Sequence, residues 1–350
     1  MNMSEIPPIQ PGQSSTVRNV PRNHWYVVAG REEIGRTILS RRMLDQPLVL
    51  YRTESGMAVA FPDRCPHRLM ALSKGKLIGD DLECPYHGFR YGPRGNCTKI
   101  PTQGAIPSAM SVRSFPIVEK GYWAWIWMGD ADKAGSEPIP DSHVKDHHHK
   151  TFSFTYPVQG NYMRLHENLL DTSHPSFLHA GAFDDGDLAE STFKVEEEGR
   201  IVRLTRQSRR PVIPGASTIR TFGLEPGKAV TRTLISESHA PNLSTIINRF
   251  TYVDEPNSPV VEMVNEFPIS PGGPKLCYQF WSTATNFPMA IDDGVNAYFK
   301  SIMAQDDFAI QSIESNLDAC PDAFEVSVRA DEAAVRFRRI VMQLVASETA

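Results

Sequence analysis

The sequence predicts an α+β protein with an N-terminal all-β domain and a C-terminal antiparallel sheet with flanking helices. Three observations predict this class. The chain has 350 residues, more than a single core usually holds. Its first third contains short apolar runs separated by Gly and Pro clusters, which is typical of small β domains. Beyond residue 140, strand-like runs occur together with segments of helical periodicity, which favours a sheet with helices on one side.

In the first domain, the runs PLVLYR (47–52), MAVAF (57–61) and WAWIW (123–127) predict strands. The polar segment at 129–140 contains Gly and Pro, lacks periodicity and is the best linker candidate. We therefore expect the first domain over residues 18–130 and the second over residues 131–350.

In the second domain, a helix is expected around 161–170. Strands are expected at 201–206, 245–253 and 260–267. Two helices should follow near 293–316 and 330–346, the last because Phe337 and Val341 recur at helical spacing.

Composition narrows the classes of partner. The net charge of −5, from 36 basic and 41 acidic residues, gives no reason to expect nucleic acid or a membrane surface as the main partner. No apolar run reaches the roughly 18 residues of a membrane helix. Residues 1–17 lack the apolar segment of a secretory signal, so we expect a disordered tail on a cytoplasmic protein. The five scattered cysteines argue against a disulfide framework and leave metal ligation open.

Two short loops, CPHR with Cys65 and His67 and CPYHG with Cys84 and His87, carry the strongest chemical signal. Two thiolates and two imidazoles could hold one zinc ion. However, zinc fingers usually group Cys with Cys and His with His, whereas each loop here offers one of each. A Rieske [2Fe–2S] cluster takes two Cys on one iron and two His on the other, so this division favours the cluster. Residues 20–130 resemble the Rieske domain of ring-hydroxylating and demethylating oxygenases.

A second motif surrounds the stretch LLDTSHPSFLH. Asn168, Asp171, His174 and His179 resemble, position for position, the N-x-x-D-x-x-H-x-x-x-x-H motif of the same oxygenases. The resemblance implies that both histidines bind a mononuclear non-haem Fe(II), which two imidazoles and a carboxylate can hold with positions left open for O₂ and substrate. Pro175 should interrupt the helix, which would let both histidines face one cavity.

The third ligand should be a carboxylate from the expected helix at 298–313. Its two adjacent acids, Asp306 and Asp307, fall on two different apolar stripes, so periodicity does not choose between them. The family resemblance implies Asp307.

Asp171 has two expected roles. A carboxylate three residues before His174 could accept a proton from that ligand and fix its ring. The resemblance further implies that Asp171 contacts His87 of a neighbouring subunit in a homotrimer, so that electrons pass between subunits.

The resemblance is to the group of vanillate and dicamba O-demethylases and caffeine N-demethylases. It implies a terminal oxygenase that monooxygenates a small aromatic or heterocyclic substrate, with O- or N-demethylation and release of formaldehyde. Ring or methyl hydroxylation without dealkylation, dioxygenation, and an electron carrier without chemistry are the alternatives. The sequence has no G-x-G-x-x-G fingerprint, so NADH should bind a partner flavin reductase that supplies electrons directly or through a ferredoxin.

Two groups of residues could contact the redox partner or the substrate of such an oxygenase. Between Arg64 and Lys99, seven basic residues face three acidic ones, an excess that could steer an acidic iron–sulfur partner. Arg220, Arg232 and Asn248 could each orient a carboxylate or ring heteroatom of the substrate, although a surface role is expected for any single one of them.

Overall fold

The computed structural model describes residues 20–180, 182, 189–255, 257–289, 293–320 and 322–349. Contacts divide the chain into two compact units. One holds Arg22–Ile139 with Ser270–Gly273, and the other holds Pro140–Ile269 and Pro274–Ala350. The tail expected over residues 1–17 lies outside the described residues.

The first unit extends beyond residue 130, where its end was expected, to Ile139 within the predicted linker. A physical reason is visible at Trp25, whose indole Nε1 donates to the Glu137 carbonyl at 3.0 Å and ties this segment to the first unit.

Three small antiparallel sheets form the first unit, in the orders β1-β10-β9, β2-β3-β4 and β5-β6-β7-β8. Their apolar core includes both cysteines of the predicted cluster loops, Cys65 and Cys84, packed among buried aromatic and aliphatic side chains. The strands are β1 Trp25–Gly30, β2 Leu39–Met43, β3 Gln46–Arg52, β4 Ala58–Pro62, β5 Lys76–Ile78, β6 Asp81–Glu83, β7 Arg90–Tyr91, β8 Cys97–Lys99, β9 Ile117–Lys120 and β10 Trp123–Trp127.

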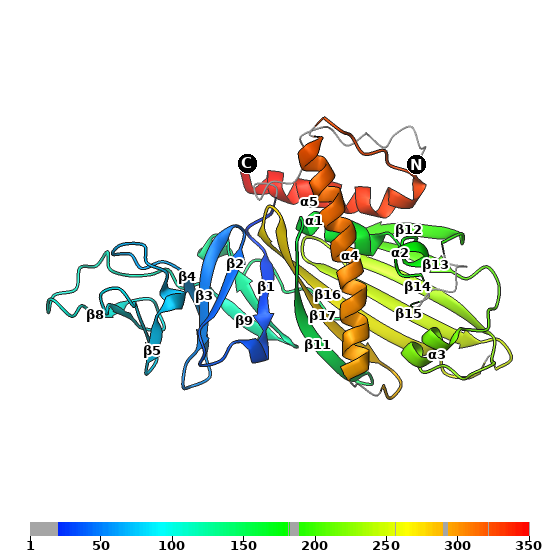
Figure 1. Ribbon diagram of the computed structural model, residues 1–350, viewed down its shortest axis with the longest axis horizontal. Coiled ribbons are helices and arrows are strands. Elements are labelled where there is room, and N and C mark those ends of the chain that lie inside the picture. Colours follow the sequence, from blue (N-terminus) through cyan, green and yellow to red (C-terminus); the bar gives the residue numbers. More distant parts are fainter. Residues whose placement is uncertain are drawn as a thin grey trace. The chain divides into compact units, whose positions relative to one another are not determined.

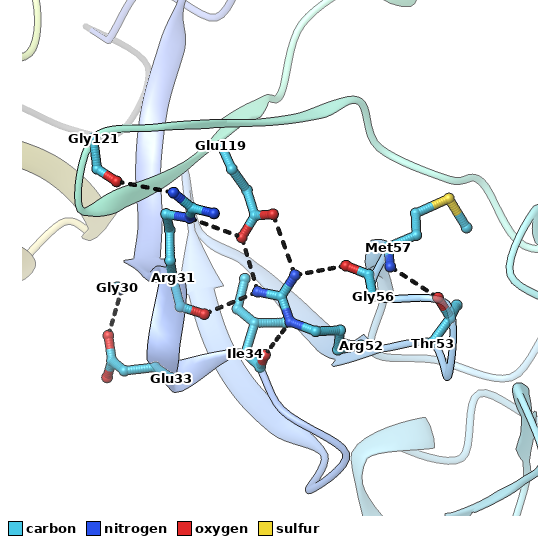
Figure 2. A network of polar contacts seen from close by, with 10 residues as sticks. All are labelled: Gly30, Arg31, Glu33, Ile34, Arg52, Thr53, Gly56, Met57, Glu119 and Gly121. Atoms are coloured by element: carbon cyan, nitrogen blue, oxygen red, sulfur yellow. Dashed lines mark hydrogen bonds and ion pairs between the residues drawn. The ribbon is translucent and has the colours of Figure 1, made fainter.

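A bidentate ion pair joins two of these sheets (Figure 2). Arg52, at the end of β3, donates to the Glu119 carboxylate of β9 at 2.8 and 3.2 Å. The same guanidinium also donates to the carbonyls of Ile34 and Arg31. The hydrogen bond from Arg52 lowers the pKa of Glu119 despite partial burial. Paired guanidinium–carboxylate bonds of this kind fix geometry as well as adding energy, so this pair helps hold the β2-β3-β4 and β1-β10-β9 sheets together.

The second unit contains one seven-stranded sheet in the order β11-β17-β16-β15-β14-β13-β12, with antiparallel neighbours. Buried and less buried residues alternate along β13, as the period of a strand with one covered face requires. The strands are β11 His149–Val158, β12 Phe193–Glu198, β13 Ile201–Gln207, β14 Val230–His239, β15 Leu243–Tyr252, β16 Val261–Gly273 and β17 Leu276–Thr285.

Helices cover this sheet (Figure 1). The long α4 crosses it, and its Phe299 ring lies 5.0 Å from Phe152 of β11 and 5.1 Å from Trp281 of β17. Helix α1 contacts β14, β15 and β17, and also both α4 and α5. The helices are α1 Tyr162–Leu170, α2 Pro175–Leu178, α3 Ala216–Phe222, α4 Asp293–Ala319 and α5 Glu332–Thr349. Within the described part of the chain, no helix is long and apolar enough to cross a membrane.

The predicted fold class is confirmed, an all-β unit followed by an antiparallel sheet with helices. All six strands named from the sequence are present, and so are the three helices expected near 161–170, 293–316 and 330–346.

Candidate active site

The two Cys–His loops of the first unit are built alike. Cys65 and Cys84 each accept at their backbone carbonyl from the amide four residues on, Leu69 and Gly88, at 2.8 and 3.0 Å. Leu69 and Gly88 both have positive φ, 58° and 70°. Each cysteine amide in turn donates to the carbonyl five residues on. The shared backbone turn explains why two loops of different sequence can present one thiol and one imidazole each.

In each loop the sulfur is buried and the imidazole is exposed. Cys65 and Cys84 are both 1% exposed. The rings of His67 and His87 lie at the surface with their Nδ1 atoms 3.2 Å apart. Burial raises the pKa of the Cys84 thiol. The hydroxyl of the buried Tyr91 lies 3.1 Å from Cys65 Sγ. The two sulfur atoms therefore lie inside the unit, and the two imidazoles lie at its surface.

The geometry also separates the two metal hypotheses for these loops. Around one zinc ion with bonds of about 2.0–2.3 Å, all ligand atoms approach one another closely. No three of the ligand atoms of Cys65, His67, Cys84 and His87, all of them described residues, lie within 4.8 Å of one another. A cluster with two cysteines on one iron and two histidines on the other spreads its ligands in this way, so the four residues fit a Rieske cluster.

In the second unit, a helix break brings two histidines together. Helix α1 ends at Leu170 and α2 begins at Pro175, with His174 as its N-cap residue and His179 as its C-cap residue. The break expected at Pro175 is therefore present. His174 Nδ1–H donates to the Asp171 carbonyl at 2.7 Å, and His179 Nδ1–H donates to Gln305 Oε1 at 2.7 Å. Both bonds fix the tautomer and leave both Nε2 atoms as acceptors, the arrangement that metal ligation needs.

The group that faces both Nε2 atoms is Asp306 of α4. Its Oδ1 lies 3.1 Å from His179 Nε2 and 3.5 Å from His174 Nε2. The three ligand atoms lie within 4.8 Å of one another. Burial alone would raise the pKa of Asp306, but the two neighbouring imidazoles of His174 and His179 outweigh it and lower that pKa to about 2. Two imidazoles and one carboxylate on one side of a cavity are the donor set of the facial triad for Fe(II).

The structure corrects the expectation that Asp307 completes this set. Asp307 Oδ1 accepts from the Gln159 amide at 2.8 Å, and its Oδ2 accepts from Gln311 at 3.0 Å. Successive residues of a helix are turned by about 100°, so two adjacent carboxylates do not face the same cavity. Asp306 lies on the buried face of α4, and Asp307 lies at its edge.

The remaining motif residues surround this group. Asn168 Nδ2 donates to Asp306 Oδ1 at 3.1 Å and so orients the carboxylate. The expectation that the Asp171 carboxylate receives the His174 proton is wrong in this structure, because Asp171 Oδ2 is 3.9 Å away and the backbone carbonyl takes that role. The Asp171 carboxylate instead accepts from the amide and hydroxyl of Ser173.

Gln305, which orients His179, was missed from the sequence. Its position next to Asp306 on α4 was the only available signal, and a lone glutamine there does not indicate a role.

A cavity opens beside His174, His179 and Asp306. The sheet contributes apolar and aromatic side chains to its lining, together with a few polar ones. Arg232 and Asn248 are buried in this lining, 6% and 4% exposed, so the surface role expected for them is wrong. Arg220 is exposed and lines a different cavity.

Comparisons with known proteins agree with both halves of this arrangement. Residues 24–116 match the Rieske [2Fe–2S] domain, and residues 158–347 match the vanillate O-demethylase oxygenase C-terminal domain. The dicamba O-demethylase oxygenase component of Stenotrophomonas maltophilia is 42% identical over 160 residues, 45% of this chain. That alignment spans 47% of the relative, about half its length. The vanillate O-demethylase oxygenase subunit of Pseudomonas sp. strain HR199 is 25% identical over 342 residues, covering 94% of this chain and 96% of that protein.

Solved structures of dicamba monooxygenase are similar over nearly the whole chain. The structure bound to 3,6-dichlorosalicylic acid has a TM-score of 0.83 and 27% identity, covering 96% of this chain and 100% of that one. A structure with non-haem iron and dicamba has a TM-score of 0.77 and 26% identity, covering 94% and 98%.

Proposed function

Since this chain belongs to the family of Rieske non-haem iron oxygenases with a vanillate O-demethylase-type C-terminal domain, we propose that it is the terminal oxygenase of a multicomponent monooxygenase. The observation that carries the proposal is the convergence of His174, His179 and Asp306 on one side of a largely apolar cavity. A Rieske cluster in the same chain provides a source of single electrons for that site.

Iron held by His174, His179 and Asp306 would supply the O₂-activating centre, and the cluster would supply its electrons. The protein contributes the rest. The Asp171 carbonyl and Gln305 hold the two imidazoles with Nε2 toward the metal, and Asn168 orients the carboxylate. The aromatic rings that line the cavity exclude water and offer a flat apolar wall to an aromatic substrate.

The proposed reaction is oxidative demethylation of a small aromatic or heterocyclic methyl ether or N-methyl compound. One atom of O₂ is inserted into a methyl C–H bond, and the other is reduced to water with two electrons and two protons from the partner chain of carriers. The resulting hemiacetal or hemiaminal breaks at its C–O or C–N bond and releases formaldehyde. The names of the dicamba and vanillate O-demethylases among the relatives support this reaction class.

Electrons are proposed to reach the cluster from an NADH-dependent flavin reductase, directly or through a ferredoxin. The surface exposure of His67 and His87 supports docking of such a partner at the cluster loops. Exposed basic residues on the surrounding segments would favour an acidic carrier. They are Arg64, Arg68, Lys74, Lys76, Arg94 and Lys99.

The assembly is proposed to be a homotrimer in which the cluster of one subunit serves the iron of the next through Asp171. Asp171 supports this role by its position, because it follows α1 directly and its side chain is 31% exposed beside His174. Its carboxylate is thus available to a neighbouring imidazole while its carbonyl holds an iron ligand.

The test is formaldehyde release by the purified oxygenase supplied with electrons from a reductase and ferredoxin pair. Methoxylated benzoates, methoxylated phenols and N-methyl heterocycles are offered, and O₂ uptake, formaldehyde and product are measured. We expect formaldehyde in equal amount to a demethylated product, and none from an Asp306→Asn variant with an intact cluster. A hydroxylated product without formaldehyde would indicate hydroxylation instead of demethylation. If none of the substrates in the panel stimulated O₂ uptake, the support for this reaction class would be removed.

A further inference from the structure

One arginine of the sheet contacts the turn between α1 and α2. Arg206 of β13 lies on the cavity face of the sheet, because it pairs directly with Leu234, which lines the cavity. Its Nε donates to the hydroxyl Oγ1 of Thr172 at 2.5 Å. Thr172 lies in the turn between Asp171 and His174, is 3% exposed and lines the same cavity.

The guanidinium of Arg206 is itself fixed at several points. The residue is 2% exposed, and its Nη1 donates to the carbonyls of Ser191 and Ala189 at 2.8 and 3.2 Å. Its Cζ lies 4.7 Å from the centroid of the Phe193 ring. A guanidinium is planar and presents its N–H groups in a rigid fork, so the bonds at Nη1 also set the direction of the Nε–H. Arg206 is therefore a fixed donor for the Thr172 hydroxyl.

Thr172 shares a peptide unit with the group that orients an iron ligand. The peptide between Asp171 and Thr172 contains the Asp171 carbonyl, which accepts from His174 Nδ1–H at 2.7 Å. A peptide unit is planar and includes the Cα atoms at both of its ends. Because Thr172 is held at one end of this plane, the direction of the carbonyl oxygen is held as well. The path therefore runs from Arg206 through Thr172 to the ring of His174.

Two further bonds of this turn are local. The Asp171 carboxylate accepts from both the amide and the hydroxyl of Ser173. These bonds fix the shape of the turn but move with it, whereas the bond from Arg206 ties the turn to a strand of the sheet. That strand, β13, pairs with β12 on one side and β14 on the other. A metal site is held precisely when its ligands are supported from such rigid elements.

From these contacts we propose that Arg206 is a positioning residue for the mononuclear iron site. It acts through Thr172 to fix the direction in which His174 presents its Nε2. This inference rests on the proposed oxygenase function and adds to it a residue outside the N-x-x-D-x-x-H-x-x-x-x-H motif. Loss of the bond should loosen one iron ligand and leave the Rieske cluster, which lies in the other unit, unchanged.

Exchanges at Thr172 test the hydroxyl with little change in volume. Thr172→Val replaces the acceptor oxygen with a methyl group, and Thr172→Ser keeps the oxygen. The measurements are the dissociation constant of Fe(II) and the EPR spectrum of the nitric oxide complex of the mononuclear iron, both without substrate. The spectrum reports ligand geometry, which a general loss of stability would not change.

We expect Thr172→Val to weaken iron binding by roughly 10-fold, as for loss of a group that supports a metal ligand, and to change the spectrum. Thr172→Ser should match the unmodified protein in both measurements. Iron binding and a spectrum in Thr172→Val equal to those of the unmodified protein would overturn the proposal. Equal changes in Thr172→Val and Thr172→Ser would also overturn it, because the effect would then not follow the hydroxyl.

Exchanges at Arg206 test the other end of the bond. Arg206→Met removes the donor and should reproduce the changes seen in Thr172→Val. Because the two residues act on one path, the double variant should lose no more iron affinity than Arg206→Met alone, and additive losses would contradict the path. If Arg206→Met does not fold, the two Thr172 variants decide the question.

Arg203→Gln is the matched control. Arg203 lies on the same strand as Arg206 but three residues away, so it faces the opposite side of the sheet, where it pairs with Glu237. The control should leave iron binding and the spectrum unchanged. Changes in Arg203→Gln as large as those in Arg206→Met would overturn the assignment, because they would reflect the loss of any arginine from β13.

Failure of this inference and failure of the proposed function give different results. Weakened iron binding in Thr172→Val, with no formaldehyde released from any substrate by the unmodified protein, would leave Arg206 as a positioning residue and remove demethylation. Formaldehyde release by the unmodified protein, with unchanged iron binding and spectrum in Thr172→Val, would do the reverse.

Discussion

At the residue scale, the metal site depends on which of two adjacent acids of α4 faces the cavity. Asp306 lies 3.1 Å from His179 Nε2, whereas the Asp307 carboxylate bonds to the Gln159 amide and Gln311. Periodicity alone left both open, because each lies on an apolar stripe. The buried residues of α4 settle it physically, since Phe299, Ile302, Met303, Asp306 and Ile310 follow one helical face.

Asp306→Asn should therefore lose the mononuclear iron and retain the cluster, while Asp307→Asn should retain both. Loss of a charged ligand should weaken iron binding by more than the roughly 10–100-fold typical of losing a supporting group. The check is iron per chain after dialysis, with the cluster absorbance as internal reference. Iron loss from Asp307→Asn and not from Asp306→Asn would contradict the site as described.

Tyr91 should tune the cluster. A ligated Cys65 thiolate can only accept a hydrogen bond, so the Tyr91 hydroxyl 3.1 Å away is the donor. This bond stabilises the more negative, reduced state. Its removal in Tyr91→Phe should lower the one-electron potential by roughly 40 mV, the equivalent of about 1 kcal/mol.

The measurement for Tyr91 is a redox titration of the cluster followed by EPR. Tyr51→Phe is the matched control, because Tyr51 is equally buried in this core but donates to the Asp80 carbonyl. A potential in Tyr91→Phe equal to that of the unmodified protein would refute the role of this bond.

At the element scale, α1 positions Asn168 and the Asp171 carbonyl, and it is packed through His166. This ring is fully buried, contacts Phe337 of α5 with centroids 4.6 Å apart and hydrogen-bonds Ser244 of β15 at 2.8 Å. Burial lowers the pKa of His166 to about 3. The neutral ring is therefore part of the contact between α1, α5 and the sheet.

This burial predicts a pH dependence of stability. The unfolded chain binds a proton at His166 below about pH 6.5 and the folded chain only below about pH 3, so between these values unfolding takes up one more proton. The free energy of unfolding should fall with decreasing pH in that window by up to about 1.4 kcal/mol per unit. Above pH 7 the group contributes no slope.

Comparing urea unfolding of the unmodified protein and His166→Gln from pH 7 to pH 4 isolates this contribution. The variant should show the shallower decline with acid. Parallel declines in the two proteins would mean that His166 is not held neutral.

Much of the fold could be predicted because its elements follow local rules. Strand-like runs identified β13, short apolar runs identified β3 and β10, and Pro175 marked the break of the helical segment at the histidines. The site was harder to predict from the sequence. The Cys–His loops and the two histidines are short motifs, but Gln305, Asn248 and Arg232 meet the site only through the pairing of distant strands and helices. No local pattern encodes that pairing.

At the scale of the whole molecule, the proposed function requires electrons to pass from the cluster to the iron site. Asp171 is the proposed connection between subunits. Asp171→Asn should keep both metals, because the Asp171 carbonyl that holds His174 is unchanged. The same variant should slow electron transfer from the cluster to the iron by about 10-fold or more, the usual effect of losing a group that supports a metal ligand.

Single-turnover oxidation of the reduced cluster in the presence of O₂ and substrate measures this step. Asp307→Asn is the control, because it also removes a carboxylate from the second unit. Electron transfer in Asp171→Asn at the rate of the unmodified protein would exclude Asp171 from the electron-transfer path.

Anaerobic iron and sulfide analysis with EPR of the reduced protein shows whether one chain holds both a Rieske cluster and a separate iron. The expected result is the two irons and two sulfides of a [2Fe–2S] centre plus one further iron that is lost in Asp306→Asn. A cluster signal without the further iron would leave only an electron carrier, and bound zinc without sulfide would contradict both metal assignments.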